Sequence, residues 1–598
     1  MSSLKDLASL IMIPSLVKDG RLDTVKPLGN SIIHPDATGN NDGTDGSTPA
    51  EGNFTFTRGS NLSATRVDAS QLIEKGRENL LLQSNQFDTT WTTGATLTSG
   101  QSGYNGNNAW KFASSSGGQT GVQQSVSFSN IHTFSVYAKA GSVDFIKLFV
   151  VQSGTNRTCV IDLSDGSIAN DNSVSASSPA ASVTSLANGW YRIEMPTNAN
   201  SATFVRIRPQ LSEGDDNLSV GDFIYIQDTQ LEQGLVATPY IETGASTAQA
   251  GILENTPRLD YSGGATCPSL LLEPSRTNII PYSEDFSQST WQKQSAGVAS
   301  APIVTINYAI SPDGTLNASR VIFDINGGTT SSDFSQLTDP VSTNIGDVTN
   351  SVYIKSNTAS NYNMSFVNAL GGSLVSIVVT PEWQRFDITG TTISTSSSFR
   401  LRLRGSESTS DSADVSLWGA QIEQGSYPTS YIPTYGVSQT RSQEAFTRTG
   451  ISSLINSQKG VFFVEMAAFS SNTGTSLLSL SDGGPTNNIY IGFTSTTNQI
   501  SAVLYANGSA QGGVNSFSYD VKQMNKIAVS YKPNEFKLFI NGSLVGTDTN
   551  ATMPNANTLN KFSSDFGQGS FKLAAELNQA IIFPTALTDS ECIALTTI

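Results

Sequence analysis

Three arginines alternate with hydrophobic residues in the stretch Phe399-Arg-Leu-Arg-Leu-Arg404. In a β-strand this alternation places Arg400, Arg402 and Arg404 on one face, about 7 Å apart along the chain. Like charges at this spacing destabilise a sheet unless an opposite charge lies across them. Arginine binds carboxylates and similar anions in a bidentate manner. We therefore expect either Asp and Glu of neighbouring strands or subunits, or an acidic or sulfated glycan, across the three guanidinium groups.

The residues that usually carry catalysis or bind metals are sparse. The chain has two histidines, His34 and His132, and three cysteines, Cys159, Cys267 and Cys592, with no metal-ligand spacing among them. A Ser-His-Asp or Cys-His arrangement is therefore disfavoured. The 49 acidic residues could supply the carboxylate pair of a glycosidase, but no pair stands out. We expect a protein that is not an enzyme, with no catalytic residues and no cofactor.

Charge and hydropathy exclude two classes of partner. The formal net charge of −16 does not provide the basic surface that nucleic-acid binding needs. The longest apolar run, residues 7–17, is too short to span a bilayer and contains a proline. We expect no nucleic acid and no membrane insertion.

Two copies of one peptide organise the middle of the chain. Gln230-Leu-Glu-Gln-Gly234 returns as Gln421-Ile-Glu-Gln-Gly425, and each copy leads to a Tyr-Ile-x-Thr segment. Each copy is preceded by a matching opening segment, Arg77-Glu-Asn79 or Arg276-Thr-Asn278. A recurrence at a domain-sized interval indicates one structural unit that occurs twice. We predict that opening and closing segments meet in a structural clasp, and that ligands bind elsewhere.

Within the repeats the hydrophobic pattern has the period of β-strands. Phe134, Val136 and Ala138 alternate with Ser135, Tyr137 and Lys139, which predicts a strand with one buried face. Each repeat holds several such runs and no helical periodicity. The sequence therefore predicts an all-β chain of tandem antiparallel sandwiches of the jelly-roll type.

The tryptophans are the first residues to consider for sugar stacking. Four of the six occupy matching places in the repeats, which favours a role in the core: Trp91 with Trp291, and Trp190 with Trp383. Trp110 and Trp418 have no Trp counterpart. Because Trp418 adjoins the closing segment and is expected to be buried, Trp110 is the better candidate for a ligand platform.

The two repeats resemble the carbohydrate-binding-module jelly rolls of phage structural and fibre proteins. The resemblance rests on the Arg-x-Asn opening, a Ser-x-x-Phe segment followed by Trp, and the Gln-x-Glu-x-Gly closing with Tyr-Ile-x-Thr. It covers about residues 76–243 and 275–434. These are framework motifs and do not specify a sugar.

The C-terminal part has a different pattern. Lys526–Tyr531 and Glu535–Ile540 alternate as strands, and Asn541-Gly542 predicts a type I′ hairpin turn. A short helix capped by Thr588 or Asp589 is expected near the end. Residues 446–598 resemble the concanavalin A-like jelly roll of laminin G and pentraxin domains, which implies glycan binding, sometimes through calcium. Asp482 lies in a Ser-Asp-Gly-Gly loop, but no set of calcium ligands is identified.

The N-terminal segment is expected to contact another protein. Leu4, Leu7, Leu10 and Ile11 have helical spacing, which predicts a short helix that ends at Pro14. Residues 39–53 are rich in Gly and Asp, which predicts an extended, loop-rich arm.

The expected organisation follows from these patterns and resemblances. It is an N-terminal virion-anchoring segment (1–75), jelly-roll module 1 (76–245), a connector (246–275), jelly-roll module 2 (276–440) and a lectin-like domain (441–598). The resemblance implies a phage virion protein, a homotrimeric tail or head fibre that docks on other virion proteins and binds host-surface glycans. Two alternatives are a capsid or neck decoration protein that binds other virion proteins, and a polysaccharide depolymerase.

Overall fold

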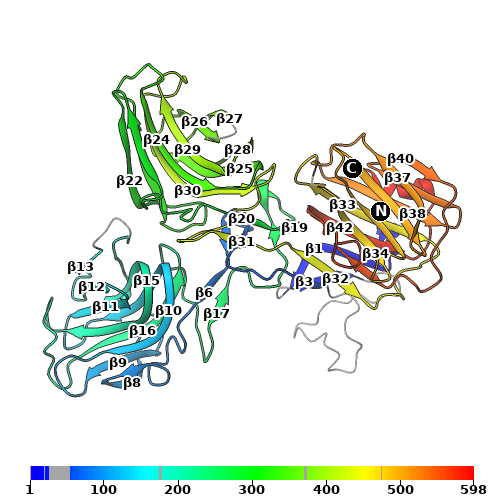
Figure 1. Ribbon diagram of the computed structural model, residues 1–598. Helices are drawn as coiled ribbons and strands as arrows, with labels where there is room; N and C mark the ends of the chain where they lie inside the picture. Colours follow the sequence, from blue (N-terminus) through cyan, green and yellow to red (C-terminus); the bar gives the residue numbers. More distant parts are fainter. Residues whose placement is uncertain (1, 19–20, 26–53, 174–177, 369–372, 473) are drawn as a thin grey trace.

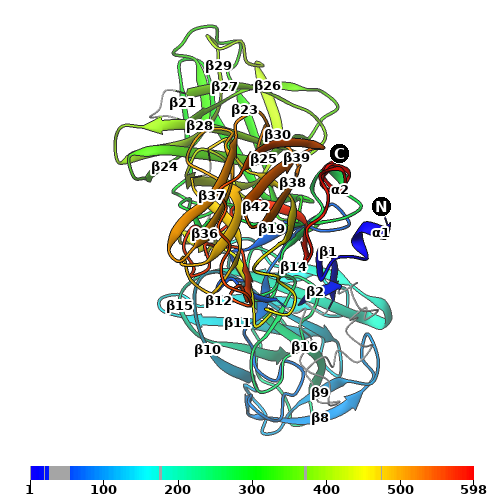
Figure 2. The ribbon, with the colours of Figure 1, turned by 90° about the vertical axis from the view of Figure 1, so that its right-hand side faces the viewer.

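The computed structural model describes residues 2–18, 21–25, 54–173, 178–368, 373–472 and 474–598. The arm expected at residues 39–53 lies outside the described residues. Within them the fold is all-β, and the strands form three sandwiches, as the alternating hydrophobic pattern predicts. Figure 1 shows the second sandwich above the first, with the third, which carries both chain termini, beside them. Figure 2 shows the same arrangement from the side of the third sandwich.

The first sandwich is one continuous sheet that folds over on itself. Its strands β10 and β15 are long and pair from Val122↔Ile207 to Lys139↔Trp190, with register shifts near Phe128 that allow the sheet to bend. The core lies between the two layers. The strands are β7 (Thr92–Thr93), β8 (Ala95–Gln101), β9 (Ala109–Ser114), β10 (Val122–Lys139), β11 (Phe145–Gln152), β12 (Arg157–Asp162), β13 (Ile168–Asp171), β14 (Ser182–Ser185), β15 (Trp190–Gln210) and β16 (Phe223–Gln233).

The second sandwich has the same plan in two separate five-stranded sheets, ordered β21-β24-β29-β26-β27 and β22-β23-β30-β25-β28. Each long strand of the first sandwich corresponds here to two shorter strands. The strands are β21 (Gln292–Ala296), β22 (Ser300–Ala309), β23 (Ala318–Asp324), β24 (Phe334–Ser342), β25 (Gly346–Ser356), β26 (Tyr362–Asn368), β27 (Ser373–Val379), β28 (Gln384–Thr392), β29 (Ser396–Arg404) and β30 (Ser412–Gln424).

The third sandwich collects strands from distant parts of the sequence. One sheet contains β1 (Leu10–Lys18), β2 (Arg21–Val25), β18 (Leu259–Asp260), β19 (Ser269–Leu272), β33 (Gly460–Ala468), β38 (Asn525–Lys532), β39 (Glu535–Ile540), β40 (Ser543–Asp548) and β42 (Ala575–Phe583). The other contains β3 (Thr55–Thr57), β32 (Ala445–Thr449), β34 (Ser476–Ser481), β35 (Asn488–Phe493), β36 (Ile500–Ala506), β37 (Ser509–Ser516) and β41 (Lys561–Ser563).

The prediction of a helix through Leu10 and Ile11 is wrong. Helix α1 covers only Ser2–Lys5, and both residues lie in β1, which pairs with β42. Leu10 and Met12 enter the core of the third sandwich because the edge of β42 is open to a further strand. The segments expected as an N-terminal anchor and as a connector therefore both supply strands to this sandwich.

Short two-stranded sheets and one C-terminal helix complete the chain. The paired strands are β4 (Thr65–Val67) with β5 (Ile73–Lys75), β6 (Arg77–Asn79) with β17 (Ala248–Ala250), and β20 (Arg276–Asn278) with β31 (Gln439–Arg441). Helix α2 (Asp589–Thr596) is capped by Thr588, which forms a capping box with Glu591, as expected. No helix among the described residues is long and apolar enough to cross a membrane.

Five buried charges hold the connecting segments together. This buried charge cluster consists of Arg58, Arg258, Arg441, Glu273 and Glu444, which the sandwiches exclude from solvent. Arg58 lies 3.1 Å and Arg258 2.6 Å from Glu444, while Arg258 and Arg441 lie 2.7 and 3.0 Å from Glu273. Burial would raise the pKa of Glu273, but Arg441 and Arg258 lower it to about 2. Burial would also raise the pKa of Glu444, but Arg258 and Arg58 lower it below its usual value. Both carboxylates are therefore ionised, and the cluster links the second and third sandwiches.

Candidate functional site

The predicted clasp is present in both repeats, where the side-chain amides of Asn79 and Asn278 in the opening segments donate to carbonyls of the closing segments. Glu232 accepts hydrogen bonds from the backbone N–H and the hydroxyl of Thr238 (both 2.6 Å), and Glu423 accepts the same two from Thr429 (both 2.7 Å). A glutamine two residues earlier also donates to each glutamate, from Gln230 or Gln421. The glutamates are buried and fully engaged, so they act as framework groups.

The tryptophan expected to stack on a ligand is part of the core. Trp110 lies on β9, is 7% exposed, and donates from Nε1 to the carbonyl of Asn85 at 2.9 Å. Its ring packs edge-on against Phe87. Trp418 is buried as expected, whereas Trp383 is half-exposed, unlike its buried counterpart Trp190. Trp110 therefore offers no indole face to a sugar.

The alternating arginines lie on the outer face of a sheet, as predicted. Leu401 and Leu403 of β29 enter the core of the second sandwich, so the arginines between and beside them face outward. The pairing register places Arg402 between Gln336 of β24 and Ser365 of β26. We call this surface the arginine face; it comprises Arg400, Arg402, Arg404, Gln336, Ser365 and Ser398.

Internal pairing accounts for two of the three arginines. Arg402 Nε donates to Glu407 at 2.9 Å, and Arg404 Nη1 lies 3.6 Å from the same carboxylate. Arg404 Nε also donates to the carbonyl of Ser331 at 2.6 Å. Arg400 forms no ion pair with any described residue. Burial and the two neighbouring guanidinium groups lower the pKa of Arg400, and the negative charge of Glu407 offsets this only in part.

Several buried polar atoms on the arginine face have no partner among the described residues. They are Arg400 Nε, Ser365 Oγ and Ser398 Oγ. A buried polar atom without a hydrogen bond costs free energy, so such a group is expected to meet water or a ligand. The face therefore combines unsatisfied buried polar atoms with an arginine, Arg400, that has no ion-pair partner among the described residues, and a positive charge of this kind suits a carboxylate or sulfate. Sequence reasoning missed Ser365, because which residue lies across from an arginine depends on strand register. It also missed Ser398, which the alternation along β29 could have placed on the face of Arg400.

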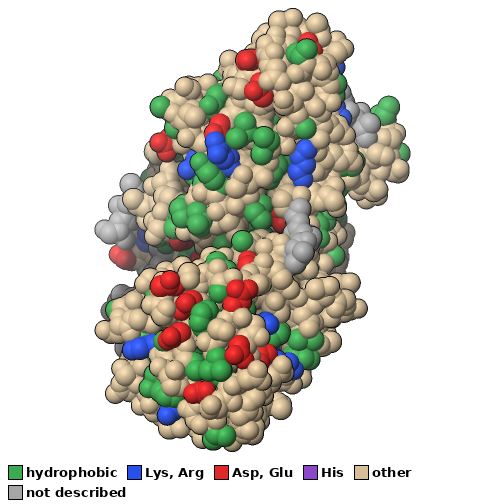
Figure 3. All heavy atoms as spheres, turned by 90° about the vertical axis from the view of Figure 1, so that its left-hand side faces the viewer, with side chains coloured by type: hydrophobic (Ala, Val, Ile, Leu, Met, Phe, Trp, Pro, Cys, Tyr) green, Lys and Arg blue, Asp and Glu red, His purple; other side chains and the backbone are tan. Residues whose placement is uncertain are grey.

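The surface of the second sandwich, which carries the arginine face, differs in charge from the surface of the first sandwich. On the side shown in Figure 3, Asp and Glu side chains gather over the lower, first sandwich, whereas on the upper, second sandwich basic and hydrophobic side chains lie together among more scattered Asp and Glu side chains. In the first sandwich, Arg206 donates to Gln123 at 2.7 Å and Arg208 lies 3.7 Å from Asp216. Arg206 nevertheless has no ion pair among the described residues, and Arg208 Nε has no hydrogen-bond partner among them, so this shorter arginine pair is also incompletely engaged.

The loop of Asp482 in the third sandwich is held by its own hydrogen bonds. Asp482 accepts hydrogen bonds from the N–H of Gly484 at 2.9 Å and from Asn487 at 2.8 Å, so it shapes its own loop. No group of three or more His, Cys, Asp or Glu among the described residues could hold a metal ion.

The family comparison concerns the third sandwich. Residues 462–592 match the family model of the concanavalin A-like lectin/glucanases superfamily. No curated protein matches the chain.

Three solved structures illustrate the similarity. The carbohydrate-binding module 40 of a Ruminococcus gnavus sialidase is 18% identical and has a TM-score of 0.20, over 24% of this chain and 83% of that one. A pentraxin from Limulus polyphemus is 12% identical with a TM-score of 0.20, over 24% and 71%. Tandem carbohydrate-binding modules 51 from Streptococcus pneumoniae are 13% identical with a TM-score of 0.15, over 61% and 97%. Scores this low carry no argument about arrangement or ligand.

Proposed function

We propose that the protein is a structural virion protein of a bacteriophage, a tail or head fibre, that attaches to host cells by binding acidic surface glycans. The observation that carries the glycan part is the arginine face, where Arg402 and Arg404 pair with Glu407 and Arg400 has no ion-pair partner among the described residues. The family match of residues 462–592 supports a role in glycan binding. The virion part is supported by the framework motifs of the two repeats, which resemble those of phage fibre proteins.

The chemistry of the arginine face favours an anionic sugar. Arg400 can form a bidentate contact with a carboxylate or sulfate because no described residue pairs with its guanidinium group. The hydroxyls of Ser365 and Ser398 are buried, so contact with a sugar falls to the partly exposed Arg400. One such contact is weak, and a homotrimer would multiply it into useful avidity. The proposal includes no catalytic step.

A matched pair of ligands tests the glycan part. The full chain should bind an acidic polysaccharide, such as polygalacturonate or heparin, and should lose this binding when the carboxylates are reduced or the sulfates removed. Binding should also weaken as salt concentration rises, since the contact is ionic. Equal binding of the charged and neutralised polymers would contradict the proposal.

The virion part needs a second experiment. Purified protein should bind host cells and reduce phage adsorption. Protein that binds phage particles but not cells would instead indicate a capsid or neck decoration protein. Release of reducing ends from the polysaccharide would indicate a depolymerase.

A further inference from the structure

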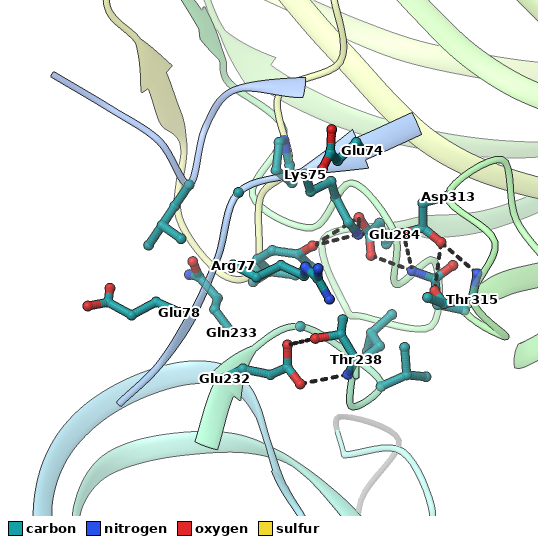
Figure 4. A pocket seen from close by; sticks show the side chains of 18 of the residues that line it. Glu74, Lys75, Arg77, Glu78, Glu232, Gln233, Thr238, Glu284, Asp313 and Thr315 are labelled. Carbon is teal, nitrogen blue, oxygen red and sulfur yellow. Dashed lines mark hydrogen bonds and ion pairs between the residues drawn. The ribbon is translucent and has the colours of Figure 1, made fainter. Parts of the chain in front are cut away.

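A cavity of about 460 Å³ lies where the first and second sandwiches meet the segment around β6. Its size is within the range of small-molecule sites. Figure 4 shows Lys75, Glu284 and Asp313 pointing toward one another on one side, with Glu232 and Thr238 on the other and Arg77 between them. The lining comes from both repeats, so the cavity depends on how the two sandwiches are placed.

Most charges around the cavity are already paired. Lys75 Nζ lies 3.0 Å from Glu284 and 2.6 Å from Asp313, and it donates to the hydroxyl of Tyr435 at 3.2 Å. Glu232 is engaged by Thr238, as described above. These groups hold the sandwiches together and have little capacity left for a ligand.

Arg77 is the exception, and the second repeat shows why. Its counterpart Arg276 lies 3.6 Å from Glu423 and 5.3 Å from the ring centre of Tyr427. The repeat alignment places Val236 where the second repeat has Tyr427. Arg77 has neither contact within the described part of the chain, and both Arg77 and Val236 line the cavity. The missing tyrosine ring thus leaves both an open volume and a free guanidinium group.

Two further polar atoms at the cavity lack partners among the residues that the structure describes. Asn317 Oδ1 and His132 Nδ1 form no hydrogen bond, although these residues are only 1% and 7% exposed. Burial lowers the pKa of His132 to about 4, so its ring is neutral near pH 7. The carboxylates of Glu78, Glu232, Glu284 and Asp313 also line the cavity and disfavour an anion.

We propose that this cavity binds one or two units of a neutral, hydroxyl-rich sugar, with Arg77 donating to its oxygens and Asn317 Oδ1 accepting from a hydroxyl. Leu235, Val236 and Pro239 provide apolar wall for the C–H faces of the ring. The site is separate from the arginine face and does not require an acidic ligand. It would make sugar binding depend on the junction between the repeats.

The second repeat suggests a substitution that tests whether the cavity binds a sugar. Val236→Tyr introduces the ring that the second repeat already carries, so it should fill the cavity without disturbing the clasp. We expect Val236→Tyr and Arg77→Gln each to weaken binding of neutral mono- and disaccharides to the full chain by about tenfold or more, measured by calorimetry or ligand-observed NMR. Arg276→Gln, the matched change in the second repeat, should alter binding by less than about twofold.

Two controls separate the outcomes. Thermal unfolding of each variant shows whether it is folded, and Arg400→Gln should leave neutral-sugar binding unchanged. The proposal is overturned if no neutral sugar in a panel of glucose, galactose, mannose, N-acetylglucosamine and their disaccharides binds. It is also overturned if folded Val236→Tyr binds as well as the natural protein.

Discussion

Asn79 and Asn278 occupy equivalent places in the two repeats and make the same four hydrogen bonds. Each side-chain amide donates to two carbonyls of its closing segment, and each side-chain oxygen accepts from two backbone N–H groups. The partners are Thr229, Ile241, Leu81 and Leu231 in the first repeat, and Ala420, Ile432, Ile280 and Ile422 in the second. Both side chains are fully buried, so each asparagine fastens the start of its sandwich to its end.

Replacing either asparagine by alanine should therefore unfold its own sandwich more readily. Asn79→Ala and Asn278→Ala each leave two carbonyls and two N–H groups without partners, at a cost of about 2–4 kcal/mol. Calorimetry should show one lowered unfolding transition in each variant. Asn217→Ala in an exposed loop of the first sandwich is the control. Similar effects of Asn217→Ala and Asn79→Ala would show that the clasp is not what stabilises the repeat.

Leu10 should matter to stability far more than Leu7. Leu10 is buried in the core of the third sandwich through β1, whereas Leu7 is 40% exposed. Leu10→Ala should destabilise this sandwich by about 2–5 kcal/mol, and Leu7→Ala by less than about 0.5 kcal/mol. Denaturant unfolding, followed through the transition of the third sandwich, measures both. Equal, small effects would mean that β1 does not complete this sheet in solution.

Glu444 should be the most sensitive acidic residue of the connecting region. Glu444→Gln leaves the buried Arg58 without its counter-charge and leaves Arg258 with Glu273 alone, which should cost about 3–5 kcal/mol. Glu535→Gln removes surface pairs with Lys532 and Lys537 and should cost less than about 1 kcal/mol. The comparison is made by thermal unfolding at neutral pH. A Glu444→Gln protein as stable as Glu535→Gln would rule out a stabilising role for the buried charge cluster.

Glu273 should make this region sensitive to acid. Its pKa falls from 4.5 to about 2 on folding, so the folded state binds fewer protons than the unfolded state. The stabilisation is therefore complete above pH 4.5 and is lost as the pH falls toward 2, by roughly 3 kcal/mol in total. The unfolding temperature should decline as the pH is lowered across this range, and the unfolding temperature of Glu273→Gln should decline less steeply. If the unfolding temperatures of the natural protein and Glu273→Gln depended on pH in the same way, Glu273 would not be the source of the acid sensitivity.

Local signals in the sequence were sufficient for several elements. Asn541 and Gly542 have φ values of 48° and 80°, as the predicted hairpin turn requires. The alternation from Phe399 to Arg404 correctly placed the three arginines outward, because period-two patterns depend only on the strand itself.

Features decided by distant contacts were not predictable. The spacing of Leu4, Leu7 and Leu10 favours a helix, but the open edge of β42 draws Leu10 into a strand. Trp110 lacks a Trp counterpart because Ser319 occupies the equivalent position in the second repeat. Trp110 donates to the carbonyl of Asn85, and Ser319 donates to the carbonyl of Glu284, which is the equivalent group. The absence of a counterpart thus reflects repacking of a core. The difference between Val236 and Tyr427, by contrast, was visible in the repeat and could have pointed to the cavity.

The most direct test of the proposed function compares two arginines of the second sandwich. Arg400 has no ion-pair partner among the described residues, whereas Arg320 on the other sheet pairs with Asp414. Affinity of the full chain for an acidic polysaccharide should fall by about tenfold in Arg400→Gln and by less than about twofold in Arg320→Gln, although both lose one positive charge. Equal affinities of the two variants would contradict binding through the arginine face.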